Sequence, residues 1–386
     1  DRDSQGRGGG MRITGAQVFD PEQGFVSRDL CVEHGTITGE AEGTVSAQGC
    51  WVIPGLTDLH FHGCRGEDFS DATPEGLQVM ADYELSRGIT QICPAGMTLG
   101  EEQLIRICQN AAAHRARGAG GAELVGINLE GPFLSYAKKG AQNAAFLHAP
   151  DVAMLHRLQT AAQGLVKLVT LAPEEPGALE FIRGAQAENI TVSLGHTTAD
   201  YDTAAAAYRA GARQATHLFN AMPPFTHREP GVVGAAFDCS QARAELISDG
   251  VHIHPAVVRA VFQLFGRDRV ILVSDSLRAT GMPDGRYPFG GQTIEVKGNR
   301  ATMADDPNTL AGSVSDLMSC MCTAVSFGIP LADAVMAAAV NPAKALGIYD
   351  RVGSLDIGKE ANAAVLNEDL SLRAVLFHGQ VVQGAL

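Results

Sequence analysis

The sequence has no apolar run of about 18 residues, the length at which a membrane-spanning helix is expected. Positive charge is also in deficit: 29 Lys and Arg stand against 43 Asp and Glu, which gives a net charge of −14. We therefore expect no nucleic-acid partner and no anionic membrane partner. The first ten residues, DRDSQGRGGG, lack the apolar segment of a signal peptide and are expected to form a tail.

The eight cysteines form no CxxC pair, so the sequence offers no thiolate zinc site of the usual spacing. Cys320 and Cys322 are the closest pair, and their apolar neighbours predict structural thiols on a buried helix. Reduced thiols and the missing export signal together predict a cytoplasmic protein.

Eight strand-like runs alternate with segments of helical periodicity, which predicts a (β/α)8 barrel. Five of the runs end on a residue that can bind a metal. These five are 57–62 (TDLHFH), 124–130 (LVGINLE), 190–196 (ITVSLGH), 214–217 (QATH) and 270–275 (VILVSD). The other three runs are 89–94, 166–172 and 244–249, and the expected helices are 74–87, 101–117, 151–162, 177–187, 200–210 and 255–265. Because the carboxyl ends of barrel strands meet at one face, the five end residues are expected to converge.

Short strands flank the barrel signal at both ends of the chain, at 11–19, 29–33, 363–366 and 374–377. We expect a tail at 1–10, a small β-sandwich domain built from 11–55 plus 346–386, and a catalytic barrel at 56–345. Two excursions, 131–150 and 284–312, interrupt the barrel alternation. The second contains a hairpin signal, with strands 292–296 and 300–304 around Lys297-Gly298-Asn299.

The candidate metal ligands carry only nitrogen and oxygen donors. His60 and His62 are two residues apart, so an extended strand points both rings to one face. Glu130, His196, His217 and Asp275 complete the set. Such donors suit Zn²⁺, Fe²⁺, Mn²⁺ or Co²⁺, held as one or two ions, with the two oxygens of Glu130 able to bridge a pair. Asp275 can bind a metal and also accept a proton from a water molecule.

At this point the sequence resembles a known family. PGLTDLHFHG (54–63) and GSLDIGKEANAAVL (353–366) look like the amidohydrolase superfamily. Within it, seven further motifs are similar to N-acetylglucosamine-6-phosphate deacetylases. They are LEGPFLS (129–135), KKGAQN (138–143), SLGHT (193–197), THLFNAMPP (216–224), HREPG (227–231), SDGVHIHP (248–255) and LAGS (310–313).

The resemblance implies hydrolysis of the acetamide of N-acetylglucosamine 6-phosphate, in amino-sugar catabolism and cell-wall recycling. Glu130, His196 and His217 would hold the principal ion, and Asp275 would be the catalytic carboxylate. The substrate would be bound by Asn220, Ala221, Arg228, His252, Gln142, His227 and Leu310. Some members of the family have a histidine where this chain has Gln142.

The resemblance also implies a homodimer in which Arg228 reaches the site of the neighbouring subunit. An ion pair between Arg228 and Glu229 is the alternative for that side chain.

Three other functions remain open at this stage. The galactosamine 6-phosphate epimer differs at one hydroxyl group, which no residue of the sequence reads. A cyclic-amide hydrolase of the same superfamily is less consistent with the motifs, because such enzymes often have lysine where Glu130 stands. A non-catalytic sugar-phosphate sensor would be expected to have lost some of the six metal-site residues, and all six are present.

Overall fold

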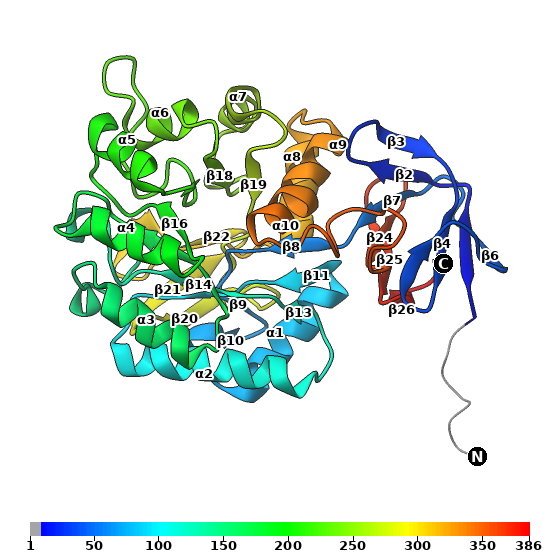
Figure 1. The fold of residues 1–386 in the computed structure, drawn as a ribbon, viewed down its shortest axis with the longest axis horizontal. Helices are drawn as coiled ribbons and strands as arrows, with labels where there is room; N and C mark the ends of the chain where they lie inside the picture. Colours follow the sequence, from blue (N-terminus) through cyan, green and yellow to red (C-terminus); the bar gives the residue numbers. More distant parts are fainter. Residues whose placement is uncertain (1–8) are drawn as a thin grey trace.

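The computed structural model describes residues 9–386, so eight residues of the predicted tail at 1–10 lie outside the described residues. A barrel surrounded by helices packs beside a smaller, all-β unit (Figure 1). The β strands of both chain ends lie side by side in the small unit, as blue and red arrows. None of the helices in this part of the chain is both long and apolar enough to cross a membrane.

The barrel consists of parallel strands in two hydrogen-bonded groups, ordered β13-β11-β8 and β12-β14-β15-β16-β17-β18-β19. The strands are β8 (Leu56–Asp58), β11 (Ile89–Ile92), β12 (Ala95–Gly96), β13 (Glu123–Leu124), β14 (Ile127–Glu130), β15 (Val166–Leu171), β16 (Thr191–Leu194), β17 (Gln214–Ala215), β18 (Arg243–Leu246) and β19 (Val270–Leu272). Because β11 continues as β12 and β13 as β14, they occupy eight positions, as predicted. The backbone N–H of Asp275 donates to the carbonyl of His60 (2.8 Å) and links the last strand to the first.

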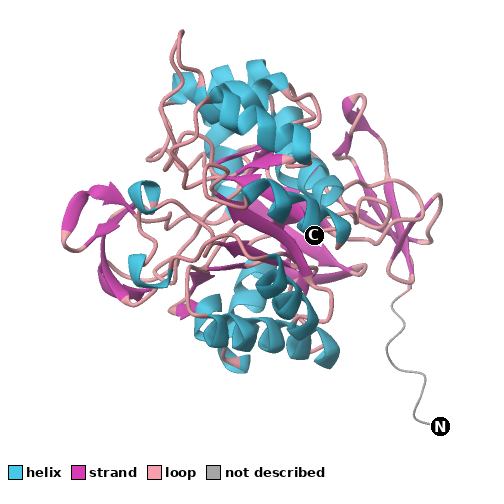
Figure 2. Ribbon diagram, turned by 60° about the vertical axis from the view of Figure 1, so that its left-hand side comes forward, coloured by secondary structure: helices cyan, strands magenta, loops and turns pink. Residues whose placement is uncertain are grey.

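Helices cover the outside of the strands (Figure 2). They are α1 (Pro74–Ser86), α2 (Glu101–Arg117), α3 (Val152–Ala161), α4 (Ala178–Ala187), α5 (Tyr201–Ala210), α6 (Gly231–Asp238), α7 (Pro255–Phe265), α8 (Leu317–Ser326), α9 (Leu331–Val335) and α10 (Asn341–Ala345), with a π-helical turn at Met336–Val340. Side-chain oxygens of Thr73, Asp151 and Asp200 cap α1, α3 and α5, which explains where these helices begin.

Leu104, Leu155 and Phe181 project from the helices onto the strands and are fully buried. Burial of a side chain of this size stabilises a fold by about 1.5–3 kcal/mol. This layer holds the strands, and so the residues at their carboxyl ends, in place.

The small unit is a sandwich of two sheets, ordered β5-β4-β1-β6 and β26-β25-β24-β7-β2-β3. Its strands are β1 (Met11–Thr14), β2 (Gln17–Asp20), β3 (Gly24–Ser27), β4 (Leu30–Glu33), β5 (Thr36–Thr38), β6 (Gly43–Ser46), β7 (Trp51–Pro54), β24 (Ala363–Leu366), β25 (Leu372–Phe377) and β26 (Gln380–Gly384). Ile13, Val18 and Leu376 contribute to a separate core between the sheets. The prediction of one strand over 11–19 was wrong: Gly15 has a φ of +78°, and the chain passes there from one sheet to the other.

The two excursions lie over the carboxyl end of the barrel. The first, after β14, contains two 3₁₀ turns, η2 (Tyr136–Lys138) and η3 (Ala144–Phe146). The second forms an antiparallel sheet of β20 (Gly285–Phe289), β21 (Gln292–Lys297), β22 (Arg300–Met303) and β23 (Asp306–Leu310). The predicted hairpin is confirmed as β21 and β22.

Candidate metal centre

The six predicted metal-site residues converge at the carboxyl end of the barrel, although they are spread over more than 200 positions of the sequence. Their ligand atoms form two groups that share Glu130. The first is His60, His62, Glu130 and Asp275, and the second is Glu130, His196 and His217. Within each group all ligand atoms lie within 4.8 Å of one another, and every residue is buried.

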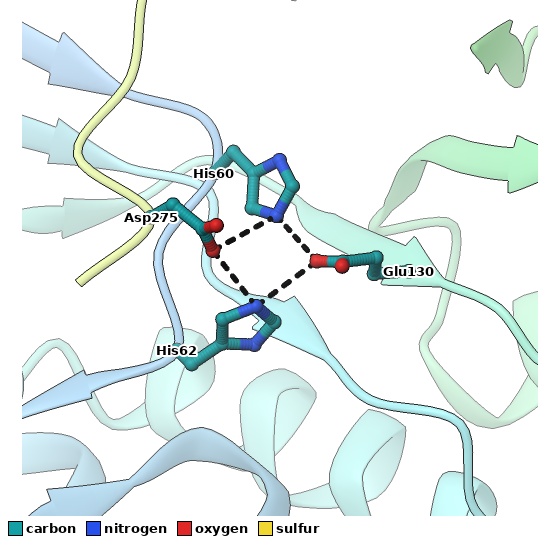
Figure 3. Close-up of side chains that lie close together, drawn as sticks. All are labelled: His60, His62, Glu130 and Asp275. Carbon is teal, nitrogen blue, oxygen red and sulfur yellow. Dashed lines mark hydrogen bonds and ion pairs between the residues drawn. The ribbon is translucent and has the colours of Figure 1, made fainter. Parts of the chain in front are cut away.

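In the first group, two imidazole rings face two carboxylates (Figure 3). Nε2 of His60 lies 2.5 Å from Oε2 of Glu130 and 3.4 Å from Oδ1 of Asp275. Nε2 of His62 lies 3.0 Å from Oε2 of Glu130 and 3.2 Å from Oδ1 of Asp275. The intervening Phe61 is fully buried in the hydrophobic core, away from these ligand atoms. The four ligand atoms therefore surround one point.

In the second group, the other oxygen of Glu130 faces two more histidines. Nε2 of His196 lies 2.9 Å from Oε1 of Glu130, and Nε2 of His217 lies 3.6 Å from the same atom. The two histidine Nε2 atoms are 3.2 Å apart. Glu130 thus directs one carboxylate oxygen at each group, which is the arrangement expected of a bridging ligand.

Acceptors behind the rings fix which nitrogen faces the centre. Nδ1 of His62 donates to the carbonyl oxygen of Ala95 (3.0 Å), and Nδ1 of His196 donates to that of Lys138 (2.9 Å). With the Nδ1 proton held in this way, the Nε2 lone pair is the one presented to a cation. The donor set and its orientation therefore fit a divalent metal.

Glu245, on β18, is a site residue that the sequence analysis missed. Its side chain is 1% exposed, and Oε1 accepts a hydrogen bond from Nδ1 of His60 (2.7 Å). Oε2 accepts from Nε2 of Gln214 (2.6 Å). The signal was an acidic residue between Ala244 and Leu246, in a run (244–249) from which the sequence analysis took no candidate ligand.

The electrostatics of the centre favour charged groups despite their burial. Burial lowers the pKa of His62, but the carboxylates of Glu130 and Asp275 outweigh it and raise the pKa to about 10. The same balance raises the pKa of His60 well above its usual value. Burial would raise the pKa of Glu130, yet His60 and His62 hold it well below the usual range. The buried carboxylates of the centre therefore favour positive charge beside them, of the kind that a divalent metal would supply.

Three of the site residues adopt a left-handed backbone conformation, with φ of +47° at His196, +26° at His217 and +48° at Asp275. Such conformations cost about 1–3 kcal/mol each for residues other than glycine and are concentrated at functional sites. Each lies where a strand ends, so the turn aims the side chain across the mouth of the barrel.

A cavity of about 450 Å³ opens onto the centre. Five of the seven predicted substrate-binding residues line it: Gln142, Asn220, Ala221, His252 and Leu310. Asn308 and Thr309 of β23 also line it and were not predicted, because a hairpin signal does not reveal over which part of the barrel the hairpin folds.

Gln142 contacts the metal centre as well as lining the cavity. Its Nε2 donates to Oε1 of Glu130 (2.9 Å), while its Oε1 accepts from the backbone N–H of Thr98 (2.9 Å). The amide therefore orients the bridging carboxylate, a contact that the prediction of substrate binding did not include.

His252 is held with its other nitrogen available to a ligand. Nδ1 pairs with Oδ2 of Asp249 (2.8 Å), and Oδ1 of Asp249 accepts the backbone N–H groups of Val251 and His252 (2.9 Å each). Burial would raise the pKa of Asp249, but these hydrogen bonds outweigh it and lower the pKa.

His227 and Arg228 are exposed and do not line the cavity of their own chain. Arg228 borders a separate surface hollow near α5 and α6. It makes no ion pair with Glu229 or with any other acidic group in residues 9–386.

The fold and the donor set define a metal-dependent hydrolase built on a (β/α)8 barrel. The model of the Amidohydrolase family matches residues 51–382, and the chain belongs to this family. The N-acetylglucosamine-6-phosphate deacetylase of Bacillus subtilis (strain 168) is 38% identical over 334 residues, which cover 86% of this chain and 84% of that protein. The N-acetylgalactosamine-6-phosphate deacetylase of Escherichia coli O157:H7 is 33% identical over an alignment that covers 86% of this chain and 87% of that protein.

Among solved structures, a mutant N-acetyl-D-glucosamine-6-phosphate deacetylase from Mycobacterium smegmatis in complex with N-acetyl-D-glucosamine-6-phosphate superposes with a TM-score of 0.91. The two sequences are 34% identical, and the superposition covers 97% of this chain and 100% of the Mycobacterium smegmatis chain. These similarities confirm the family and the barrel architecture that the motifs predicted.

Proposed function

We propose that this chain hydrolyses the acetamide of N-acetylglucosamine 6-phosphate to glucosamine 6-phosphate and acetate. The observation that carries the proposal is a buried carboxylate, Asp275, set against a two-part metal-ligand group at the base of a cavity of sugar-phosphate size. The deacetylase relatives and the sugar-phosphate complex of the Mycobacterium smegmatis protein support the same substrate class.

We further propose two ions per chain, Zn²⁺ or Fe²⁺, with Mn²⁺ or Co²⁺ as alternatives. The sulfur-free donor set suits all four metals, and the two groups sharing Glu130 suit a pair of ions. When bound, a divalent ion polarises the acetamide carbonyl and lowers the pKa of a water molecule to about 7.

Asp275 acts as the proton carrier in this proposal. Its Oδ1 belongs to the first ligand group and the residue lines the cavity, where it orients the attacking water and accepts its proton. The same oxygen then gives that proton to the leaving amine nitrogen, as general acid–base catalysis requires. His252, held by Asp249, would in its doubly protonated form donate from Nε2 to the oxygen that becomes negatively charged when the carbonyl is attacked.

The phosphate is assigned to groups at the mouth of the cavity. Asn220 and Ala221 lie there on the loop that follows β17. Arg228, whose guanidinium fork suits a phosphate, is exposed and outside its own cavity, which favours a homodimer in which it serves the neighbouring site together with His227. The homodimer, the domain boundaries at 55/56 and 345/346, and the cytoplasmic localisation stay predictions.

The second candidate function is deacetylation of N-acetylgalactosamine 6-phosphate. The relative from Escherichia coli O157:H7 favours it, at an identity within five percentage points of the Bacillus subtilis relative. The substrates share the acetamide and the phosphate, so the metal centre does not discriminate between them. The choice depends on groups near the sugar ring, such as Asn308 and Thr309.

The test is acetate release by protein of known metal content from N-acetylglucosamine 6-phosphate, its galactosamine epimer and unphosphorylated N-acetylglucosamine. We expect the first to have the highest kcat/KM and the unphosphorylated sugar the lowest. A preference for the epimer would establish the second candidate. No release from any of them by metal-loaded protein would refute both and direct attention to cyclic amides.

A further inference from the structure

Glu245 is a buried carboxylate in contact with a metal ligand, and the reaction described above makes no use of it. It projects from the middle of β18 into the barrel, whereas its neighbours Ala244 and Leu246 face the helix layer. Its Oε1 lies 2.7 Å from Nδ1 of His60, the ring nitrogen that points away from Glu130 and Asp275 in Figure 3.

The surroundings of Glu245 leave its charge to be balanced by the metal centre. Its other polar contacts are neutral: Nε2 of Gln214 (2.6 Å) and the backbone N–H of His217 (3.3 Å). Within residues 9–386 no Lys or Arg pairs with it, and the contact that it makes with the metal centre is to His60. A buried carboxylate without a counter-charge is costly in free energy, so the fold favours positive charge near His60, such as an ion bound to its other ring nitrogen.

Among the four histidines of the metal centre, the contact distinguishes His60 from His62 and His196, whose Nδ1 atoms are also held. His62 and His196 donate to backbone carbonyls, whereas His60 donates to a carboxylate. A carboxylate behind a ligating histidine fixes the tautomer and makes the opposite nitrogen a stronger donor, and loss of such a partner typically lowers metal affinity 10- to 100-fold.

We propose that Glu245 is a positioning residue that sets the affinity of the His60–His62 half of the centre for its ion. The inference rests on the proposed function, because it requires an ion between His60, His62, Glu130 and Asp275. Gln214 and the N–H of His217 hold the carboxylate, the carboxylate holds His60, and His60 presents Nε2 to the ion. Occupancy by two ions rather than one then depends on a residue that touches neither ion nor substrate.

The experiment is a competition titration of metal-stripped protein with Zn²⁺ against a chromophoric chelator, which resolves the number of ions and the Kd of each. Wild type is expected to bind two ions per chain, and His60→Ala is expected to lose one of them. Glu245→Gln keeps the shape of the side chain and removes its charge. We expect it to weaken the same ion 10- to 100-fold and to leave the other Kd unchanged.

The chain offers a matched control outside the centre in the pair of His156, which is exposed, and Glu188, which is half-buried; their Nδ1–Oε1 distance is 2.6 Å. Glu188→Gln makes the same chemical change beside a histidine on the surface and is expected to leave both affinities at wild-type values. Wild-type affinities in Glu245→Gln, with an ion still lost in His60→Ala, would overturn this inference alone. A single ion in wild type that is unaffected by His60→Ala would instead overturn the two-ion centre.

A folding failure of Glu245→Gln, checked by circular dichroism, would not end the test. Gln214→Met removes the donor to Oε2 but retains the carboxylate. It is expected to weaken the same ion by a smaller factor, and unchanged affinities in that variant would contradict the proposal.

Discussion

Replacement of Asp275 by asparagine isolates the charge of the proposed proton carrier. Asparagine has nearly the same shape and, like aspartate, tolerates the left-handed backbone at this position, where φ is +48°. The backbone contacts to His60 and Ser313 (2.8 Å each) are therefore expected to persist. The change removes the basic oxygen that lies 3.2 Å from His62 and 3.4 Å from His60.

The expected effect is large because Asp275 has two tasks in the reaction. Loss of a positioned acid–base group typically costs 10²- to 10⁴-fold in rate, which corresponds to about 3–5 kcal/mol in activation free energy. The fall should appear in kcat, with a much smaller change in KM, because the residue acts on the reacting atoms and not on the phosphate. Asp275 belongs to the first ligand group only, so the ion held by Glu130, His196 and His217 should remain.

The assay is acetate release under saturating substrate, with metal content measured on the same samples. Asp268→Asn, at an exposed position outside the cavity, serves as the control for the same chemical change and should match wild type. A metal-loaded Asp275→Asn protein whose kcat stays within about tenfold of wild type would fall short of the loss expected of an acid–base group and would refute the role assigned to Asp275.

Three further predictions test other parts of the account. Arg228→Ala should raise KM for N-acetylglucosamine 6-phosphate by tenfold or more, which is on the order expected for loss of a charged hydrogen bond. KM for the unphosphorylated sugar should not change. Equal effects on both substrates would show that Arg228 does not bind the phosphate. Glu84, buried on α1 with neither carboxylate oxygen hydrogen-bonded in residues 9–386, has a pKa that burial raises well above 4.5. Its neutral form is favoured in the fold, so stability is retained below pH 4.5 and lost as pH rises towards the folded pKa. The free energy of unfolding of Glu84→Gln should therefore rise relative to that of wild type by up to about 1.4 kcal/mol per pH unit above pH 4.5. If urea unfolding shows the same difference in free energy between the two proteins at pH 4.5 and at pH 7.5, this prediction is contradicted. Asp249 has a lowered pKa in the folded protein, so its contribution to the free energy of unfolding is present above about pH 3.8 and is lost as the pH falls through the folded pKa. Asp249→Asn should cost about 1–3 kcal/mol of unfolding free energy at pH 7 and progressively less as the pH falls through the folded pKa. A cost that stays constant as the pH is lowered, in the same urea assay, would exclude ionisation as the cause.

The convergence of the candidate ligands could be predicted from the sequence because the architecture ties the direction of a side chain to its place at a strand end. A residue at the carboxyl end of a barrel strand faces the axis whatever its distance along the chain, so His60, His196 and Asp275 could be brought together without a structure. The same reasoning overlooked Glu245, since it considered only the residues at which strands end. A buried acidic residue in mid-strand is itself a signal, because such a charge requires a partner.

Other features depended on packing that a single sequence does not encode. The helix α6 (Gly231–Asp238) was not predicted; it is short and follows a proline-rich loop, and Val232, Val233 and Ala236 are fully buried in the core. Gln142 was assigned to the substrate on the family resemblance. Its hydrogen bond to Glu130 depends on how that excursion folds back over the centre.

The central claim is that the converged histidines and carboxylates hold metal that is required for deacetylation. The most direct measurement is the rate of acetate release from N-acetylglucosamine 6-phosphate by chelator-stripped protein, as Zn²⁺ is restored in measured equivalents per chain. We predict no release from the stripped protein and a rise in rate that saturates as the centre fills. Undiminished release without metal, or none from the refilled protein, would contradict the account.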